Sequence, residues 1–180
     1  MASTAASREH ATISDWKSDR IRYGRNAWIV QPSYWAVAIY RFGRWTRQAP
    51  RIVAPALHGL YFVSYSAVRL TTGIDIPRSV EIGPGLLIHH FGGIIIHPQA
   101  KVGARCVLRQ GVTIGSRRDG ERPPTLGDDV EIGAYAQILG DIVIGNGARI
   151  GALTLVLKNV KPGSTVVGIP ARTVTRTSFS

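Results

Sequence analysis

Aliphatic side chains recur at every sixth residue in the second half of the chain, and a glycine often follows them. The longest series keeps this spacing without a break: Leu126, Ile132, Ile138, Ile144, Ile150 and Val156. Two shorter series upstream keep it as well: Ile96, Val102, Leu108 and Ile114, and before them Ile76, Ile82 and Ile88. A fixed short period of this kind indicates a repeat architecture.

A six-residue unit is too short for a pair of helices. It suits one short strand and a tight turn, with one aliphatic side chain facing inward in each unit. Three such strands make one triangular coil, and stacked coils pair their backbones in parallel. The pattern therefore predicts a mainly β protein, a left-handed parallel β-helix of hexapeptide repeats over 74–180, which is a known exception to right-handed crossover.

The six-residue spacing is interrupted twice. Between Ile88 and Ile96 two extra residues are inserted, at His89-His90-Phe91-Gly92-Gly93. Between Ile114 and Leu126 the step is twelve, and polar, turn-forming residues take the position of one strand. We predict that 116–125 form a loop extruded from the β-helix, because such residues cannot form a buried strand. Interruptions in a regular repeat are where functional residues are expected.

The N-terminal section, 1–73, has a different composition. Residues 1–26 are polar and are expected to be loose or weakly helical. From Trp28 to about Leu70, apolar side chains recur at helical spacing, and Pro50 separates two expected helices that form a short α-helical section. Arginines alternate with aromatics over 35–51, so peripheral contact with a membrane is one interpretation of this segment. Packing on the first coil or within a trimer is the favoured one.

Charge and composition narrow the class of protein. The 180 residues include 22 Lys and Arg against 11 Asp and Glu, and a net charge of +11 favours anionic partners without choosing among them. A single cysteine, Cys106, cannot form an intramolecular disulfide. The N-terminus has no apolar stretch typical of a signal peptide, and the charge-free segment over 52–68 is short for a membrane span. We therefore expect a cytoplasmic protein, with the inner face of the membrane as an alternative location.

The stretch from Asp75 to Val174 resembles the hexapeptide-repeat acyltransferases, and among them the serine acetyltransferase branch. The matching segments include Asp75-Ile76-Pro77, Gly85-Leu86-Leu87-Ile88-His89-His90, Gln110-Gly111-Val112-Thr113-Ile114-Gly115 and Gly168-Ile169-Pro170-Ala171-Arg172. The Ile-His-His-Phe-Gly segment and the short N-terminal section are more similar to acetyltransferases of exopolysaccharide gene clusters, the colanic acid type. The resemblance implies a homotrimer with acetyl-CoA as co-substrate, bound in a groove between neighbouring β-helices, with no metal and no nucleic-acid partner.

The resemblance also implies a catalytic histidine assisted by an aspartate, which by position are His90 and Asp75. Acylation of a hydroxyl by a thioester needs a base, and an imidazole suits that role. A carboxylate on the other ring nitrogen fixes the tautomer and stabilises the imidazolium. The two residues are 15 positions apart and one coil is 18, so we expect them on adjacent coils, close in space. The alternative is that His90 is a surface histidine of a turn.

Two departures from the serine enzymes concern the acceptor. Those enzymes carry an aspartate before the catalytic histidine, where this chain has His89, and a histidine in the extruded loop, where this chain has Pro123. We therefore expect O-acetylation of a sugar or glycan hydroxyl in exopolysaccharide biosynthesis, with serine O-acetyltransferase of cysteine biosynthesis as the alternative. The candidate acceptor-binding residues are His89, Arg117, Arg118 and Arg122, since guanidinium groups pair with phosphates and carboxylates.

Small residues at turns mark the candidate site for acetyl-CoA. Gly115, Ala134 and Ala152 are expected to begin turns stacked along one edge, where a pantetheine arm can approach the backbone. Lys158 and Arg172 could meet the phosphates of CoA; the alternative is that these residues only satisfy turn geometry. Cys106 is expected to be buried rather than a nucleophile, so attack would be direct. A structural β-helix without activity would leave the Asp75 and His90 pairing unexplained.

Overall fold

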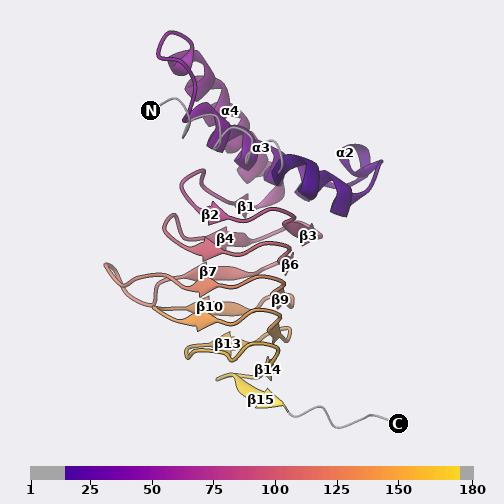
Figure 1. The fold of residues 1–180 in the computed structure, drawn as a ribbon, viewed down its shortest axis with the longest axis vertical. Coiled ribbons are helices and arrows are strands. Elements are labelled where there is room, and N and C mark those ends of the chain that lie inside the picture. The colour runs from indigo at the N-terminus through magenta and orange to yellow at the C-terminus, as the bar shows by residue number, and fades with distance from the viewer. Residues whose placement is uncertain (1–14, 175–180) are drawn as a thin grey trace.

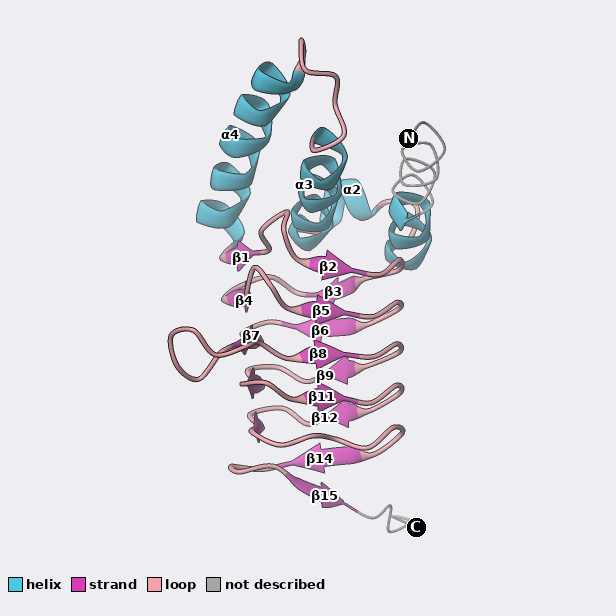
Figure 2. Ribbon diagram, turned by 60° about the vertical axis from the view of Figure 1, so that its left-hand side comes forward, coloured by secondary structure: helices cyan, strands magenta, loops and turns pink. Residues whose placement is uncertain are grey.

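The structure, a computed structural model, describes residues 15–174. A helical section lies at one end of a stack of triangular coils (Figure 1). A helix over 15–23 is followed by α2 (Ala27–Val30), α3 (Pro32–Thr46) and α4 (Ala54–Thr72). Figure 2 shows α3 and α4 standing on the first coil, with α4 leading directly into the first strand. Pro50 lies in the turn between α3 and α4, since it cannot continue a helix through its missing N–H.

The coils form three sheets, one along each side of the triangle. Sheet A contains β1 (Ile74–Asp75), β4 (Ile94–Ile96), β7 (Thr113–Gly115), β10 (Gln137–Leu139) and β13 (Leu155–Val156). Sheet B contains β2 (Glu81–Ile82), β5 (Lys101–Val102), β8 (Thr125–Leu126) and β11 (Val143–Ile144). Sheet C contains β3 (Leu87–His89), β6 (Val107–Arg109), β9 (Glu131–Ile132), β12 (Arg149–Ile150), β14 (Thr165–Val167) and β15 (Arg172–Val174). Apart from the antiparallel pair of β14 and β15, the strands pair in parallel, so the predicted parallel β-helix with N-terminal helices is confirmed.

The aliphatic residues of the six-residue period form the core. In sheet C the register aligns one inward side chain per coil: Ile88, Leu108, Ile132, Ile150 and Val166. Each of these side chains is at most 4% exposed. Burying one such side chain stabilises the fold by about 1.5–3 kcal/mol. The repeat is therefore the means by which short strands share one continuous core.

The two interruptions lie at different corners of the triangle. Residues 90–93 join β3 to β4 at the corner between sheets C and A, which we call the C–A corner. The long loop over 116–124 joins β7 to β8 at the corner between sheets A and B, the A–B corner (Figure 2). This differs from the expectation that the loop replaces a strand. Val102 pairs directly with Leu126, so the inserted residues are added to the corner and every side of that coil is kept.

The N-terminal helices are docked on the first coil by a buried ion pair. Arg41 of α3 is 1% exposed and lies 2.7 Å from Asp19, and its guanidinium also donates to the backbone oxygens of Ile82 and Gly83. Asp19 accepts in turn from the backbone N–H groups of the first coil. The described part of 1–26 is thus an anchored helix rather than a loose segment; residues 1–14 lie outside the described residues.

The aromatic segment over 35–51 packs on the first coil, which was the favoured interpretation. The Tyr40 hydroxyl is buried, donates to the carbonyl of Val80 and accepts from the N–H of Ile82. Membrane contact through this segment finds no support. Within 15–174, every helix is too short or too polar to cross a membrane.

Candidate active site

His90 stands at the C–A corner directly after β3, in an unusual backbone conformation. Its φ of 66° is in the left-handed region, which non-glycine residues adopt rarely and often at functional sites. The inserted residues fold back onto the start of β1, because a Cβ on Gly73 would lie 2.8 Å from the backbone nitrogen of Gly93. Asp75 follows Gly73 by two residues, so the candidate base and the candidate aspartate lie at the same corner.

The carboxylate of Asp75 is held by two side chains of α4. The hydroxyl of Tyr65 donates to Oδ1 in a short hydrogen bond, and the Arg69 guanidinium lies 3.6 Å from Oδ2. Among the hydrogen bonds of residues 15–174, none joins the side chains of Asp75 and His90. Tyr65 and Arg69 were not predicted from the sequence, although they are four residues apart and so share one face of the helix that precedes Asp75.

His89 is exposed on the outer face of sheet C beside His90. Partial burial lowers its pKa, and the positive charges of Arg109 and of a protonated His90 lower it further. Around neutral pH the His89 imidazole is therefore held neutral, with one nitrogen that can accept a hydrogen bond and one that can donate.

A polar side chain with a buried oxygen lies one coil below this corner. The register that pairs His89 with Arg109 puts Gln110 one coil below His90. Among the described residues, the side-chain oxygen of Gln110 is the one buried polar side-chain atom without a hydrogen-bond partner. Buried oxygens are nearly always satisfied, so this unpaired oxygen is an exception among the described residues.

The small residues proposed for acetyl-CoA do not all lie together. Ala134 and Ala152 stack at the C–A corner below His90, where the N–H of Leu153 donates to the carbonyl of Ala134 at 2.8 Å. Gly115 lies instead at the end of β7, at the A–B corner. The expectation of one shared edge was therefore wrong for Gly115. Residues 116–124, between Gly115 and Ala134, form the extruded loop, so only two sides of the coil, in sheets B and C, separate the two residues.

The two cationic candidates for the CoA phosphates are also separated within one chain. Lys158 is exposed just after β13, on the A–B side. Arg172 is exposed in β15 of sheet C, where the N–H of the preceding Ala171 donates to the carbonyl of Leu155. Lys158 and Arg172 therefore belong to different sides of the coil within one chain.

The three arginines of the extruded loop differ in how far their guanidinium groups are available to a ligand. Arg117 is paired with Glu121 inside the loop, through its backbone N–H and its guanidinium, and lies over Gly140. This pairing raises the pKa of Arg117 and lowers that of Glu121. Arg118 and Arg122 are exposed. Arg117 is thus less available to an acceptor than its position in the sequence indicated.

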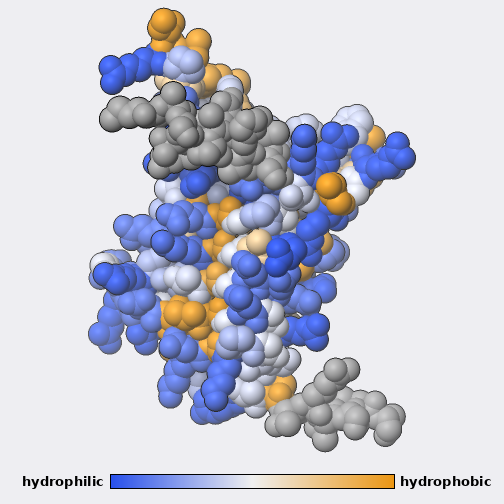
Figure 3. Space-filling model, viewed as in Figure 1, coloured by the Kyte–Doolittle hydropathy of each residue, from blue (hydrophilic) through white to orange (hydrophobic). Residues whose placement is uncertain are grey.

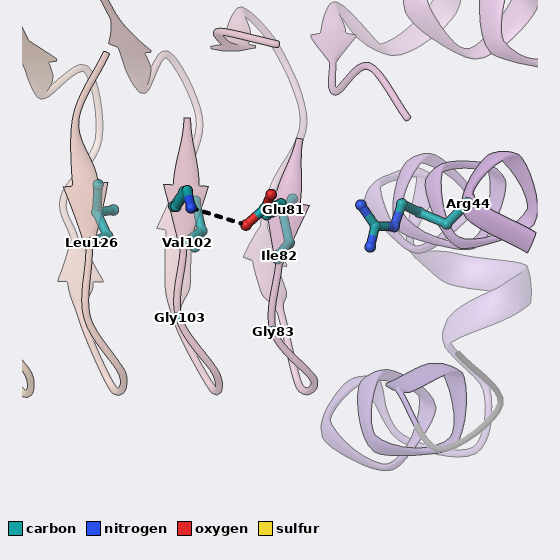
Figure 4. A pocket seen from close by; sticks show the side chains of 8 residues that line it. Arg44, Glu81, Ile82, Gly83, Val102, Gly103 and Leu126 are labelled. Carbon is teal, nitrogen blue, oxygen red and sulfur yellow. Dashed lines mark ion pairs between the residues drawn. The ribbon is translucent and has the colours of Figure 1, made fainter. Parts of the chain in front are cut away.

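Arg122 borders an open groove of about 680 Å³ where α3 meets the first coils. Arg44, Arg47 and Lys101 also line it, against Glu81 and Asp141. Figure 4 shows the adjoining part of this surface, with Arg44 projecting from α3 toward the ion pair of Glu81 and Lys101, whose charged atoms lie 3.4 Å apart. The excess of cations makes the A–B side suited to an anionic group.

Sheet A separates the two groups of candidate residues. Its outward side chains below Asp75 are uncharged: Ile95, Thr113, Gln137, Leu139 and Leu155. Figure 3 shows the molecule from the side of sheet B, where blue polar groups flank smaller orange areas; sheet A lies on the far side. His90 stands at one edge of sheet A and the extruded loop at the other, so one chain alone does not bring these two groups of candidate residues together.

Comparison with known proteins gives consistent matches. Residues 123–158 match the family model described as bacterial transferase hexapeptide (six repeats). Serine acetyltransferase from Synechococcus elongatus is 38% identical over 157 residues, 86% of this chain and 62% of that protein. Serine acetyltransferase from Helicobacter pylori is 36% identical over 162 residues, 84% of this chain and 88% of that protein. A solved structure, Neisseria gonorrhoeae serine acetyltransferase in complex with serine, has a TM-score of 0.73 at 29% identity and covers 93% of this chain and 69% of that one.

These matches correct two predictions. The closer similarity to exopolysaccharide acetyltransferases is not supported, and the prediction of a sugar or glycan acceptor is wrong, because the relatives across most of the chain are serine acetyltransferases. The changes at His89 and Pro123 were given too much weight, since two positions cannot define an acceptor site. This chain spans about three fifths of the Synechococcus relative (62%) but 88% of the Helicobacter one. From that relative, and from the β-helix described above, we conclude that the chain belongs to the serine acetyltransferase family of hexapeptide-repeat transferases.

Proposed function

We propose that this protein transfers the acetyl group of acetyl-CoA to the hydroxyl of L-serine, which gives O-acetylserine for cysteine biosynthesis. The observation that carries the proposal is His90, held in a left-handed turn at the corner where Asp75 begins the β-helix, in a chain similar to serine acetyltransferases over 84% of its length.

His90 acts as the general base. The imidazole takes the proton of the serine hydroxyl as its oxygen attacks the thioester carbonyl carbon, and the new C–O bond forms as the oxyanion develops. The C–S bond then breaks, and the thiolate of CoA leaves and receives the proton from the imidazolium. Asp75 orients the imidazole and stabilises its charged form between these steps.

Direct attack is favoured over an acetylated enzyme. Cys106 is fully buried, and burial raises the pKa of its thiol to about 11. A thiolate is needed for nucleophilic catalysis, and at neutral pH this thiol stays protonated and out of reach. Cys106 therefore serves as a small core residue.

The side chain of His89 is compatible with serine even though it replaces a carboxylate. Its lowered pKa keeps the ring neutral at the pH of the cell, so it does not repel the ammonium group. A neutral ring nitrogen can accept a hydrogen bond from that ammonium. The exposed Arg122 offers a guanidinium for the serine carboxylate.

The complete site requires a homotrimer. Three β-helices with their uncharged sheet A faces toward one axis would set the C–A corner of one copy beside the A–B corner of the next. His90, Ala134 and Ala152 of one copy would then face Lys158 and Arg122 of its neighbour. Sedimentation should give a mass three times that of the chain; a stable monomer that turns over acetyl-CoA would exclude this arrangement.

The acceptor is tested by release of the CoA thiol from acetyl-CoA, followed by mass analysis of the product. L-serine is compared with L-threonine, glycine, free sugars and nucleotide sugars. We expect a kcat/KM for serine of about 10⁴ M⁻¹s⁻¹ or more, the range of metabolic enzymes. No turnover of serine by the trimer, alongside turnover of another acceptor, would refute the proposal.

A further inference from the structure

The carboxylate of Asp75 is held by the helix that precedes it rather than by the β-helix alone. The hydroxyl of Tyr65 donates to Oδ1 and the guanidinium of Arg69 lies 3.6 Å from Oδ2. The hydrogen bond from Tyr65 uses one acceptor position of Oδ1, and Arg69 forms an ion pair at Oδ2. A carboxylate has about four acceptor positions, so acceptor capacity remains for a donor at the C–A corner.

The two side chains belong to a row of aromatic and basic groups along one face of α4. Tyr61, Tyr65 and Arg69 are spaced by four residues, which brings them onto the same face of the helix. The rings of Tyr61 and Tyr65 stack with centroids 5.5 Å apart, and the Arg69 guanidinium lies 5.7 Å from the Tyr65 centroid. These contacts on both sides of the Tyr65 ring restrict its movement, so its hydroxyl stays beside the carboxylate of Asp75.

The far end of this row is anchored in the protein. Tyr61 is 6% exposed and fills the space beside Gly43 of α3, where any side chain would collide with its ring. Its hydroxyl accepts from the backbone N–H of Arg78 at 3.2 Å, and the Arg78 guanidinium lies 4.8 Å from its ring centroid. The row therefore connects the packed helices to the first coil and ends at Asp75.

We propose that Tyr65 and Arg69 are positioning residues for the reaction, which orient the carboxylate of Asp75 toward His90 and moderate its charge. This inference rests on the proposed function. Tyr65 fixes the direction of the carboxylate, and Arg69 offsets part of its negative charge. The helical section thereby becomes part of the catalytic apparatus rather than a cap on the β-helix alone.

The charges around the corner determine the expected pH dependence. Burial, and then the hydrogen bond to Asp75, raise the pKa of Tyr65, so its phenol remains a donor through neutral pH. The other ionisable groups near this corner are Tyr61 on α4, Arg22 on the helix over 15–23 and, on the coils, Arg78, His89 and Arg109. Arg69 is positive, so it disfavours the imidazolium form of a nearby base. Its removal should move the acidic limb of the pH–rate profile to higher pH.

The test compares Tyr65→Phe and Arg69→Gln with the wild-type protein, using L-serine and acetyl-CoA across pH 5.5–9. We expect each variant to lower kcat by about 5- to 20-fold, with KM for acetyl-CoA changed less than twofold, as for a lost interaction that acts on the chemical step. Arg69→Gln should shift the acidic limb upward by about half a pH unit, and Arg69→Lys should return it toward the wild-type position.

Two control variants separate positioning from folding. Tyr40→Phe removes a buried hydroxyl that docks α3, and Arg149→Gln removes an exposed arginine 3.8 Å from Glu131. Neither should move the pH–rate profile, although Tyr40→Phe should lower thermal stability. If the wild type turns over serine while Tyr65→Phe and Arg69→Gln keep its kcat and profile, the positioning role is overturned and the proposed function stands. If the wild type does not turn over serine, both fall.

Discussion

Because Asp19 and Arg41 form a buried ion pair, we expect the stability of the docked helical section to depend on the carboxylate of Asp19. In Asp19→Ala the guanidinium of Arg41, 1% exposed, loses its partner at 2.7 Å. The backbone N–H groups of Gly85 and Leu86 also lose their acceptor, which lies 2.8 Å from each. Breaking a buried pair from one side costs about 3–5 kcal/mol. Asp15 lies 3.4 Å from the same guanidinium and can offset part of the loss, so we expect about 3 kcal/mol.

Urea denaturation at a fixed chain concentration, followed by circular dichroism, measures this loss. With a slope of about 2 kcal/mol/M, the midpoint should fall by roughly 1.5 M. Asp19→Asn keeps an oxygen for the backbone amides but loses the charge. Its midpoint should therefore lie between those of the wild type and Asp19→Ala. The matched control is Glu131→Ala, which breaks an exposed pair with Arg149 and should cost at most about 1 kcal/mol. Equal midpoints for Asp19→Ala and Glu131→Ala would refute the reasoning.

Three further predictions follow from single sites. Because burial raises the pKa of Cys106 to about 11, iodoacetamide at pH 8 should modify the folded protein at least about 100-fold more slowly than the urea-unfolded one; equal rates would contradict its burial. Gly111→Ala should cost more in urea than Gly120→Ala: both glycines have positive φ, but a methyl group at Gly111 would overlap the ring of Tyr135 and one at Gly120 meets nothing within 4 Å. The left-handed conformation alone costs about 1–2 kcal/mol, so equal losses would mean that the ring moves away freely. Asp75→Asn should lower kcat by about 10- to 100-fold and move the acidic limb of the pH–rate profile to lower pH, because the imidazolium loses a neighbouring negative charge; an unchanged profile would exclude that electrostatic role.

The β-helix could be predicted from the sequence because the residues that repeat, one aliphatic in every six, are the residues that form its core. One inward aliphatic per six residues is visible without coordinates, and Ile88, Leu108 and Ile132 stack as the spacing required. The extruded loop was equally visible as a break in that period. Its placement at a corner rather than on a side was not, since the spacing of Ile114 and Leu126 fits both arrangements.

The contacts of the helical section were not predictable in the same way. Asp19 lies in a polar segment that looked loose, and only the folded structure brings it to Arg41 and to the N–H groups of the first coil. Tyr65 and Asp75 are ten residues apart, but their hydrogen bond depends on where α4 ends and on how β1 begins. Such contacts arise from tertiary packing, which a one-dimensional pattern does not encode.

The acceptor was predicted wrongly for a related reason. Two changed residues, His89 and Pro123, were taken to define the whole acceptor site, although a small substrate can be bound by other groups. Under the proposed function, the neutral imidazole of His89 itself and the exposed guanidinium of Arg122 would bind serine.

The turnover number of His90→Ala with saturating L-serine and acetyl-CoA tests the central claim most directly. A general base acts on the chemical step, so kcat should fall by about 10²–10⁴-fold relative to the wild type. Acetyl-CoA affinity, measured by calorimetry on the same preparation, should stay within about twofold because His90 is not needed to hold the cofactor. A His90→Ala trimer that acetylates serine at a rate near that of the wild type would contradict the account.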